Sequence, residues 1–111
     1  MPQPDLNALA DRLEDISRNY AARYGIDRRD DWFLLKVQEE MGEMTQAYLT
    51  RTGRSRREPA EGETQFAAEV ADVLCQLLLF ARAAGVDIDE AVRDKWLKWE
   101  PVYGLVVEPE A

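Results

Sequence analysis

The sequence contains no histidine and only one cysteine, Cys75. Without histidine the chain cannot form a Ser-His-Asp triad, an imidazole general base or a zinc site that requires imidazole. A single cysteine excludes an intramolecular disulfide and favours a reducing compartment. Any ionisable chemistry must therefore use carboxylates, lysine, tyrosine or the lone thiol.

The chain also lacks a long uninterrupted apolar segment. Its richest apolar run, residues 73–84, is interrupted by Gln76 and Arg82 and is shorter than the roughly 20 residues that a membrane helix needs. No charged segment followed by an apolar one opens the chain, so we expect no signal peptide. These patterns predict a cytoplasmic protein without a membrane partner.

Glycine and proline are scarce, at six and five residues, and 46% of the 111 residues are hydrophobic. This composition favours one mostly helical domain over a disordered or multidomain chain. The formal net charge of −8 argues against a nucleic-acid polymer as partner and is compatible with cation binding. We therefore expect a single domain over residues 1–111, with flanking arms at 1–4 and 101–111.

Apolar periodicity and capping residues predict four helices. They span about residues 5–23, 31–52, 63–84 and 87–100. Asp5 and Asp31 are placed to cap the first two helices, Asp87 and Glu90 have the spacing of a capping box, and Pro101 is expected to end the last helix. The loop at 53–62, together with Arg51, carries arginines that either gather phosphate or are simply solvated.

The third predicted helix is apolar around nearly its whole circumference. Such a helix is usually buried on several sides, and a chain of 111 residues has little else to cover it, so a second subunit is expected. The predicted fold is all-α: a four-helix, bundle-like protomer with the second and third helices as a central antiparallel hairpin. This protomer is expected to assemble as a homodimer or homotetramer.

Two pairs of acids lie beside the apolar stripes of that hairpin. Glu40 and Glu43 are three residues apart, as are Glu69 and Asp72, so each pair shares one helix face. Counting from each pair to its helix end puts the pairs within about 5 Å of the same height. Surface acids are common on helices, but facing acids at a core edge are costly unless a cation compensates them.

The oxygen atoms of these acidic side chains indicate which kind of cation would bind. Oxygen ligands select hard ions, so Mg²⁺ is expected, with Mn²⁺ as a possible substitute. Bound Mg²⁺ is commonly completed by substrate phosphate, which points to a phosphate-bearing substrate.

The acidic motifs resemble the EExxE…ExxD signature of the MazG-like all-α nucleoside triphosphate pyrophosphatases. Glu39-Glu40-x-x-Glu43 is followed after 25 residues by Glu69-x-x-Asp72, and the similarity covers about residues 30–98. The resemblance implies hydrolysis of a nucleotide between its α and β phosphorus atoms, which releases a nucleoside monophosphate and pyrophosphate.

The resemblance also implies roles for individual residues. It makes Glu40, Glu43, Glu69 and Asp72 the ligands of Mg²⁺, and Glu39 either an additional ligand or an outer carboxylate that helps to orient the attacking water. On chemical grounds a carboxylate near the metal, either Glu39 or Glu40, is expected to be the catalytic base that accepts the proton of that water. The residues expected to bind substrate are Lys36, Lys95, Trp32 and Trp99. Trp99 stands where the family often has asparagine, so the base and sugar preference stays open.

Two other functions fit the sequence. Phosphoribosyl-ATP pyrophosphohydrolase has a related fold and related acidic motifs, and the run Glu69-x-Ala71-Asp72 suits it too. A noncatalytic helical interaction protein with a structural cation site would also place acids on amphipathic helices.

Overall fold

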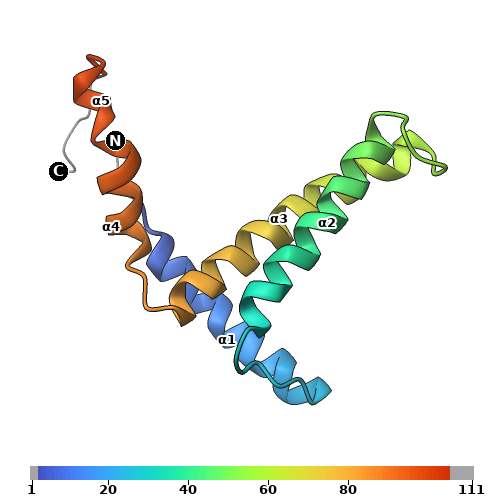
Figure 1. Ribbon diagram of the computed structural model, residues 1–111, viewed down its shortest axis with the longest axis horizontal. Coiled ribbons are helices and arrows are strands. Elements are labelled where there is room, and N and C mark those ends of the chain that lie inside the picture. Colours follow the sequence, from blue (N-terminus) through green and yellow to red (C-terminus); the bar gives the residue numbers. More distant parts are fainter. Residues whose placement is uncertain (1–2, 106–111) are drawn as a thin grey trace.

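The computed structural model describes residues 3–105, and every regular element among them is helical. The elements are α1 (Leu6–Tyr24), α2 (Trp32–Arg51), α3 (Pro59–Ala83), α4 (Ile88–Val92), a π-helical turn η1 (Arg93–Leu97) and α5 (Trp99–Val102). The last three follow one another as a single interrupted helix (Figure 1). The all-α prediction is confirmed, with four helical segments.

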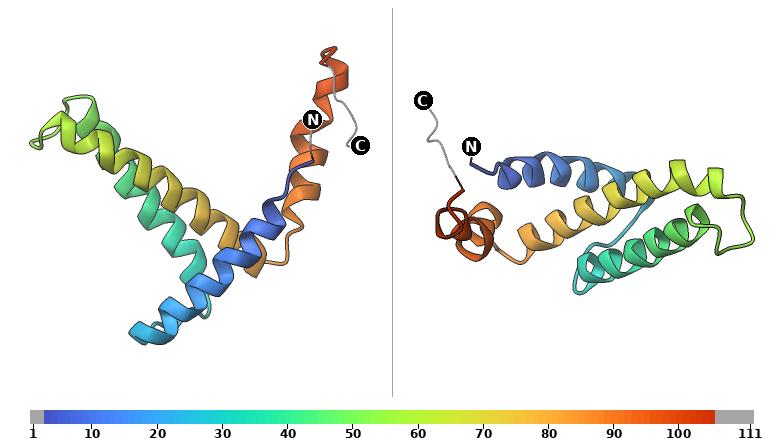
Figure 2. Two further views of the ribbon diagram at one scale, coloured as in Figure 1. Left: turned by 180° about the vertical axis from the view of Figure 1, so that it is seen from behind. Right: turned by 90° about the horizontal axis from the view of Figure 1, so that it is seen from above.

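The helices form a V in which α1 crosses near the vertex (Figures 1 and 2). One arm is made by α2 and α3, which lie side by side along their lengths. Near the connecting loop, the rings of Tyr48 and Phe66 lie 5.7 Å apart between centroids, and Arg51 pairs with Glu63 at 3.1 Å. The other arm is the interrupted helix from α4 to α5.

Gly62 lets α2 and α3 approach closely at the loop end of their arm. A Cβ atom at position 62 would lie 2.8 Å from the Arg51 Cα and 2.9 Å from the Ala47 carbonyl oxygen. Both distances are shorter than van der Waals contact, so only glycine fits without displacing the backbone of α2.

Helix α3 begins at Pro59, four residues before its predicted start at residue 63. Proline is well suited to the first helical position because the N–H group that it lacks would have no helical partner there. The exposed loop is therefore shorter than predicted.

The first two helices lack the aspartate caps that the sequence predicts. Neither Asp5 nor Asp31 accepts a capping hydrogen bond through its side chain. Instead, the Leu6 N–H of α1 donates to Oδ1 of Asp89 in α4, at 2.6 Å. A carboxylate from a helix distant in sequence thus serves the free N–H group of α1.

The last helix begins where the sequence predicts, but it ends later than predicted. Asp87 Oδ1 accepts a hydrogen bond from the Glu90 N–H at 3.1 Å, which confirms the predicted cap. Helix α5 then continues through Pro101 to Val102. Proline is accommodated because it lies in the first turn after the π-helical turn, where a missing N–H breaks no helical hydrogen bond.

A small core lies where α1, α3 and α4 meet. Its buried members are Ala10, Leu78 and Ile88, surrounded by partly buried Leu6, Leu9, Leu13, Ala81 and Val92. Among the described residues, no part of α4, η1 or α5 packs on α2, so the predicted bundle is not closed within one chain. None of the helices described is both long and apolar enough to span a bilayer.

The chain leaves much apolar surface exposed. Exposed large side chains occur on both arms. They include Leu34, Leu35, Met41, Tyr48, Val70, Leu74 and Leu77 on one arm, and Trp96, Trp99, Val102 and Tyr103 on the other.

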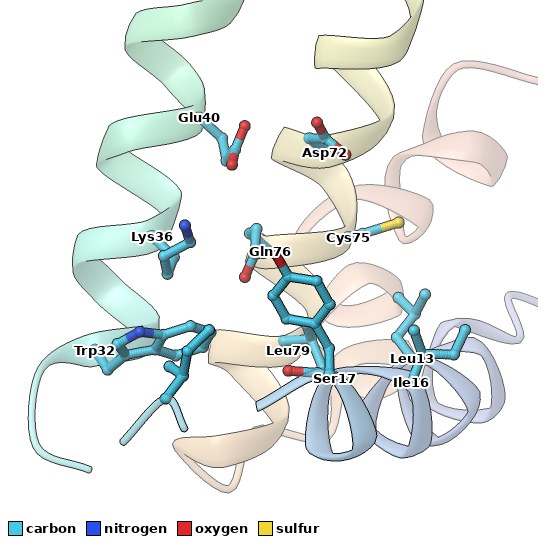
Figure 3. A pocket seen from close by; sticks show the side chains of 12 residues that line it. Leu13, Ile16, Ser17, Trp32, Lys36, Glu40, Asp72, Cys75, Gln76 and Leu79 are labelled. Atoms are coloured by element: carbon cyan, nitrogen blue, oxygen red, sulfur yellow. The ribbon is translucent and has the colours of Figure 1, made fainter. Parts of the chain in front are cut away.

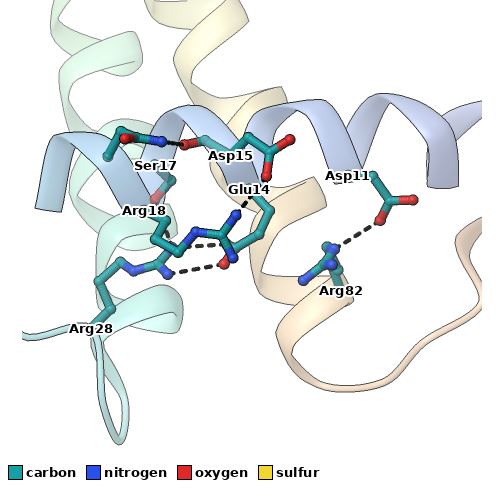
Figure 4. Close-up of polar contacts among 8 residues, drawn as sticks. Asp11, Glu14, Asp15, Ser17, Arg18, Arg28 and Arg82 are labelled. Atoms are coloured by element: carbon teal, nitrogen blue, oxygen red, sulfur yellow. Dashed lines mark hydrogen bonds and ion pairs between the residues drawn. The ribbon is translucent and has the colours of Figure 1, made fainter. Parts of the chain in front are cut away.

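Arg28 fixes the connection between α1 and α2. Its guanidinium donates to both carboxylate oxygens of Glu14, at 2.8 and 2.9 Å, and to Ser17 Oγ at 3.0 Å (Figure 4). This bidentate pair lowers the pKa of Glu14, chiefly through the hydrogen bonds from Arg28. Because Trp32 follows this connection directly, the pair helps to set where α2 begins.

Candidate functional site

Three of the four predicted metal ligands converge between α2 and α3. One carboxylate oxygen from each of Glu40, Glu43 and Glu69 lies within 4.8 Å of the other two. Glu40 is 9% exposed and Glu69 is 5% exposed, whereas Glu43 is open to solvent. These residues are called the glutamate cluster below.

The buried members of the glutamate cluster are not compensated by the protein. Oε2 of Glu40 and Oε2 of Glu69 are both buried without a hydrogen-bond partner in the described structure. Glu69 Oε1 accepts one hydrogen bond, from Gln65 Nε2 at 2.6 Å. No ion pair within residues 3–105 involves either carboxylate. Such groups require a cation or a proton to offset the cost of burial.

The environment of Glu40 raises its pKa to about 7. Burial is the largest cause, and the negative charges of Glu43, Asp72 and Glu69 add to it, together with a hydrogen bond to Glu43. Asp72, the fourth predicted ligand, is exposed and acts on Glu40 from the opposite helix. The site therefore holds more negative charge than it can keep ionised near neutral pH.

This pKa predicts how the stability of the metal-free protein depends on pH. Between about pH 5 and 7 the folded protein binds more protons at Glu40 than the unfolded chain does, so the free energy of unfolding falls as pH rises through that window. The loss is roughly 2–3 kcal/mol. Urea unfolding in chelator from pH 5 to 8 should show it for the wild type but not for Glu40→Gln. Parallel curves for the two proteins would contradict the prediction.

The glutamate cluster stands beside a cleft of about 550 Å³, to which α1, α2 and α3 all contribute (Figure 3). Glu40 and Asp72 lie at one end, and Trp32 and Leu79 lie at the other (Figure 3). The complete lining is Leu13, Ile16, Ser17, Tyr20, Ile26, Trp32, Lys36, Glu40, Asp72, Cys75, Gln76 and Leu79. The cleft thus has an acidic end and a largely apolar end.

Two of the predicted substrate-binding residues line this cleft. Lys36 and Trp32 both come from the first turns of α2, and the Lys36 ammonium lies 5.9 Å from the centre of the Trp32 ring. Lys36 also pairs with Glu39, with 3.3 Å between Nζ and Oε2. Glu39 is exposed and outside the cleft lining, so of the two predicted catalytic acids only Glu40 faces the cleft.

The other two predicted substrate-binding residues do not reach this cleft within one chain. Lys95 lies in η1 and Trp99 in α5, on the opposite arm of the V (Figure 1). Trp99 lines a separate groove with Trp96 and Tyr103. The separation arises because α4 packs on α1 and directs the rest of the chain away from α2.

The arginines near the loop are largely engaged with their neighbours. Arg51 pairs with Glu63, Arg57 pairs with Glu61 at 2.9 Å, and Arg54 lies over the Tyr48 ring. These contacts favour the solvated-loop interpretation over a phosphate clamp.

Sequence reasoning missed the part that α1 plays in the cleft, and it missed Gln76. The four lining residues of α1, from Leu13 to Tyr20, come from a helix outside the acidic motifs, so no motif indicated them. Gln76 could have been found, because it lies four residues after Asp72 and therefore one turn further on the same helix face.

Comparisons with protein-family models, with curated proteins and with solved structures gave no match.

The spacing and chemistry of the carboxylates indicate what the site can bind. Oxygens on opposite sides of one Mg²⁺ are about 4.2 Å apart, so carboxylate oxygens within 4.8 Å of one another need only small side-chain movements to share an ion. An all-oxygen donor set of this kind suits a hard divalent cation.

Proposed function

We propose that the protein is a Mg²⁺-dependent nucleoside triphosphate pyrophosphohydrolase, which cleaves an NTP or dNTP to the monophosphate and pyrophosphate. The observation that carries the proposal is the pair of nearly buried, unpartnered carboxylates of Glu40 and Glu69, of which Glu40 lines the acidic end of the cleft. The resemblance of the acidic motifs to the MazG-like pyrophosphatases supplies the reaction.

In this proposal Glu40, Glu43, Glu69 and Asp72 hold the cation. Bound Mg²⁺ would neutralise phosphate charge and polarise the phosphoryl group. The Lys36 ammonium on the cleft wall attracts the phosphate chain, and Trp32 offers a flat apolar surface beyond it. Glu40 is the carboxylate that we propose as proton acceptor, because it lines the cleft whereas Glu39 does not.

We also propose that α2 and α3 form an antiparallel hairpin at the centre of a homodimer or homotetramer. The ion pair of Arg51 with Glu63 near the loop, and the proximity of Glu40 to Glu69 further along, support the antiparallel arrangement. The exposed apolar side chains of both arms support assembly, because large apolar patches on a surface usually mark an interface.

A panel of canonical and noncanonical NTPs and dNTPs, with phosphoribosyl-ATP included, tests the reaction. With Mg²⁺ the wild type should release pyrophosphate from at least one triphosphate, and chelator should abolish the release. Glu40→Gln sets the background. Absence of pyrophosphate above that background would refute the proposal, and turnover of phosphoribosyl-ATP alone would assign the related activity. Stabilisation by Mg²⁺ without turnover would indicate a structural cation site.

A further inference from the structure

The cleft contains one amide, Gln76, that the proposed hydrolysis does not use. Gln76 lies on α3 one turn after Asp72 and contributes to the cleft lining. Its Oε1 atom is buried and accepts no hydrogen bond from any group in the described structure. A buried amide oxygen without a donor is unfavourable, so a rotation of the side chain that turns this oxygen towards a ligand N–H group in the cleft would be favourable.

Gln76 lies between the two ends of the cleft. In Figure 3 the carboxylates of Glu40 and Asp72 are on one side of its amide, and Trp32 and Leu79 are on the other. A nucleotide with its phosphates at the acids would extend through its ribose towards Trp32, so its base would approach this amide from the Trp32 side. The base would meet mostly apolar walls, since the surrounding lining includes Ile16 and other aliphatic side chains.

A nucleobase matches these walls better than a sugar does. Its two faces are apolar enough to pack against Trp32 and aliphatic side chains, and its edge carries N–H donors and acceptors in one plane. A side-chain amide presents a donor and an acceptor side by side, so it can pair with such an edge.

We propose that Gln76 is a specificity-determining residue that hydrogen-bonds the edge of the nucleobase, while Trp32 packs against the face of the base. This inference rests on the proposed function only in placing a nucleotide in the cleft. It adds how the protein discriminates between bases.

The test is the binding of AMP, CMP, GMP, UMP and IMP, measured by calorimetry in the presence of Mg²⁺, for the wild type and three variants. Monophosphates are used because their binding requires no hydrolysis. Gln76→Leu keeps a similar shape without a hydrogen bond, and Gln76→Glu keeps the acceptors without the donor. Gln38→Leu, at an exposed position on α2 outside the cleft, is the matched control.

The two variants should change base preference in different ways. Gln76→Leu should reduce the ratio of the affinities for the best-bound and worst-bound monophosphates by about tenfold, since one buried hydrogen bond is lost. Gln76→Glu should shift preference towards GMP by tenfold or more, because guanine offers two adjacent N–H donors to a carboxylate. IMP lacks the second donor and should gain much less than GMP. Gln38→Leu should keep the wild-type ranking.

Two results would overturn the role of Gln76. They are an unchanged base ranking in both Gln76 variants, and no monophosphate binding by the wild type. Failure of hydrolysis is a separate result. If the variants change base ranking as expected but no triphosphate yields pyrophosphate, the proposed reaction is wrong and the role of Gln76 in base recognition stands.

Discussion

Replacing Glu69 with glutamine is expected to abolish pyrophosphate release and, at the same time, to make the metal-free protein more stable. Glu69 is 5% exposed, and one of its oxygens has no partner in the described structure. Removing its charge relieves repulsion within the glutamate cluster and should raise the free energy of unfolding in chelator by about 1–3 kcal/mol. The same change removes a proposed Mg²⁺ ligand, so activity should fall at least a hundredfold.

This prediction is tested by three measurements on each variant: unfolding in chelator, unfolding with Mg²⁺, and pyrophosphate release. Mg²⁺ should stabilise the wild type but have little effect on Glu69→Gln, since a ligand stabilises only the state that binds it. Glu63→Gln, an exposed acid on the same helix that pairs with Arg51, is the control and should leave activity within twofold of the wild type. A Glu69→Gln protein that is both active and less stable would refute a cation site in the glutamate cluster.

In solution the chain is expected to be a homodimer or homotetramer. Large apolar side chains are exposed on both arms of the described structure, among them Leu74 and Leu77 on α3 and Trp96 and Tyr103 on the other arm. Surfaces of this kind are typical of homodimer interfaces. Sedimentation at micromolar concentration should therefore show at least twice the mass of 12.7 kDa.

Charges placed on the apolar face of α3 should break this assembly. The double variant Leu74→Glu, Leu77→Glu introduces two carboxylates where apolar side chains are about half exposed, and we expect it to sediment as a single chain. Val86→Glu is the control, because Val86 is 45% exposed, close to the 47% of Leu74, but lies in the turn between α3 and α4. A wild type with the mass of one chain would contradict the prediction, as would an unchanged assembly in the double variant.

The sequence predicted best those features that depend on helical periodicity. The spacing of Glu40, Glu43 and Glu69 along two consecutive helices was enough to bring them together, because regular helices convert residue number into position. Helix α2 likewise ended near the expected residues, since its boundaries are set by its own sequence.

Features that depend on contacts between distant segments were predicted less well. The cap of α1 comes from Asp89, which no local pattern indicates. Lys95 and Trp99 were expected near the acids, but the direction of their arm is set by the packing of α4 on α1. The role of α1 in the cleft was missed for the same reason, since periodicity gives a helix an apolar face without saying what that face will contact.

The close approach at Gly62 also bears on how the separation between α2 and α3 would vary along the cleft if their angle changed. Helices α2 and α3 are held together at the loop end, about 16 Å from Glu40 and 28 Å from Trp32 along α2 at helical rise. If the angle between the helices changed by about 5° around that point, the separation would change by roughly 1.4 Å at Glu40 and 2.4 Å at Trp32. A given change of angle between α2 and α3 at Gly62 would therefore move the acidic end of the cleft less than its apolar end.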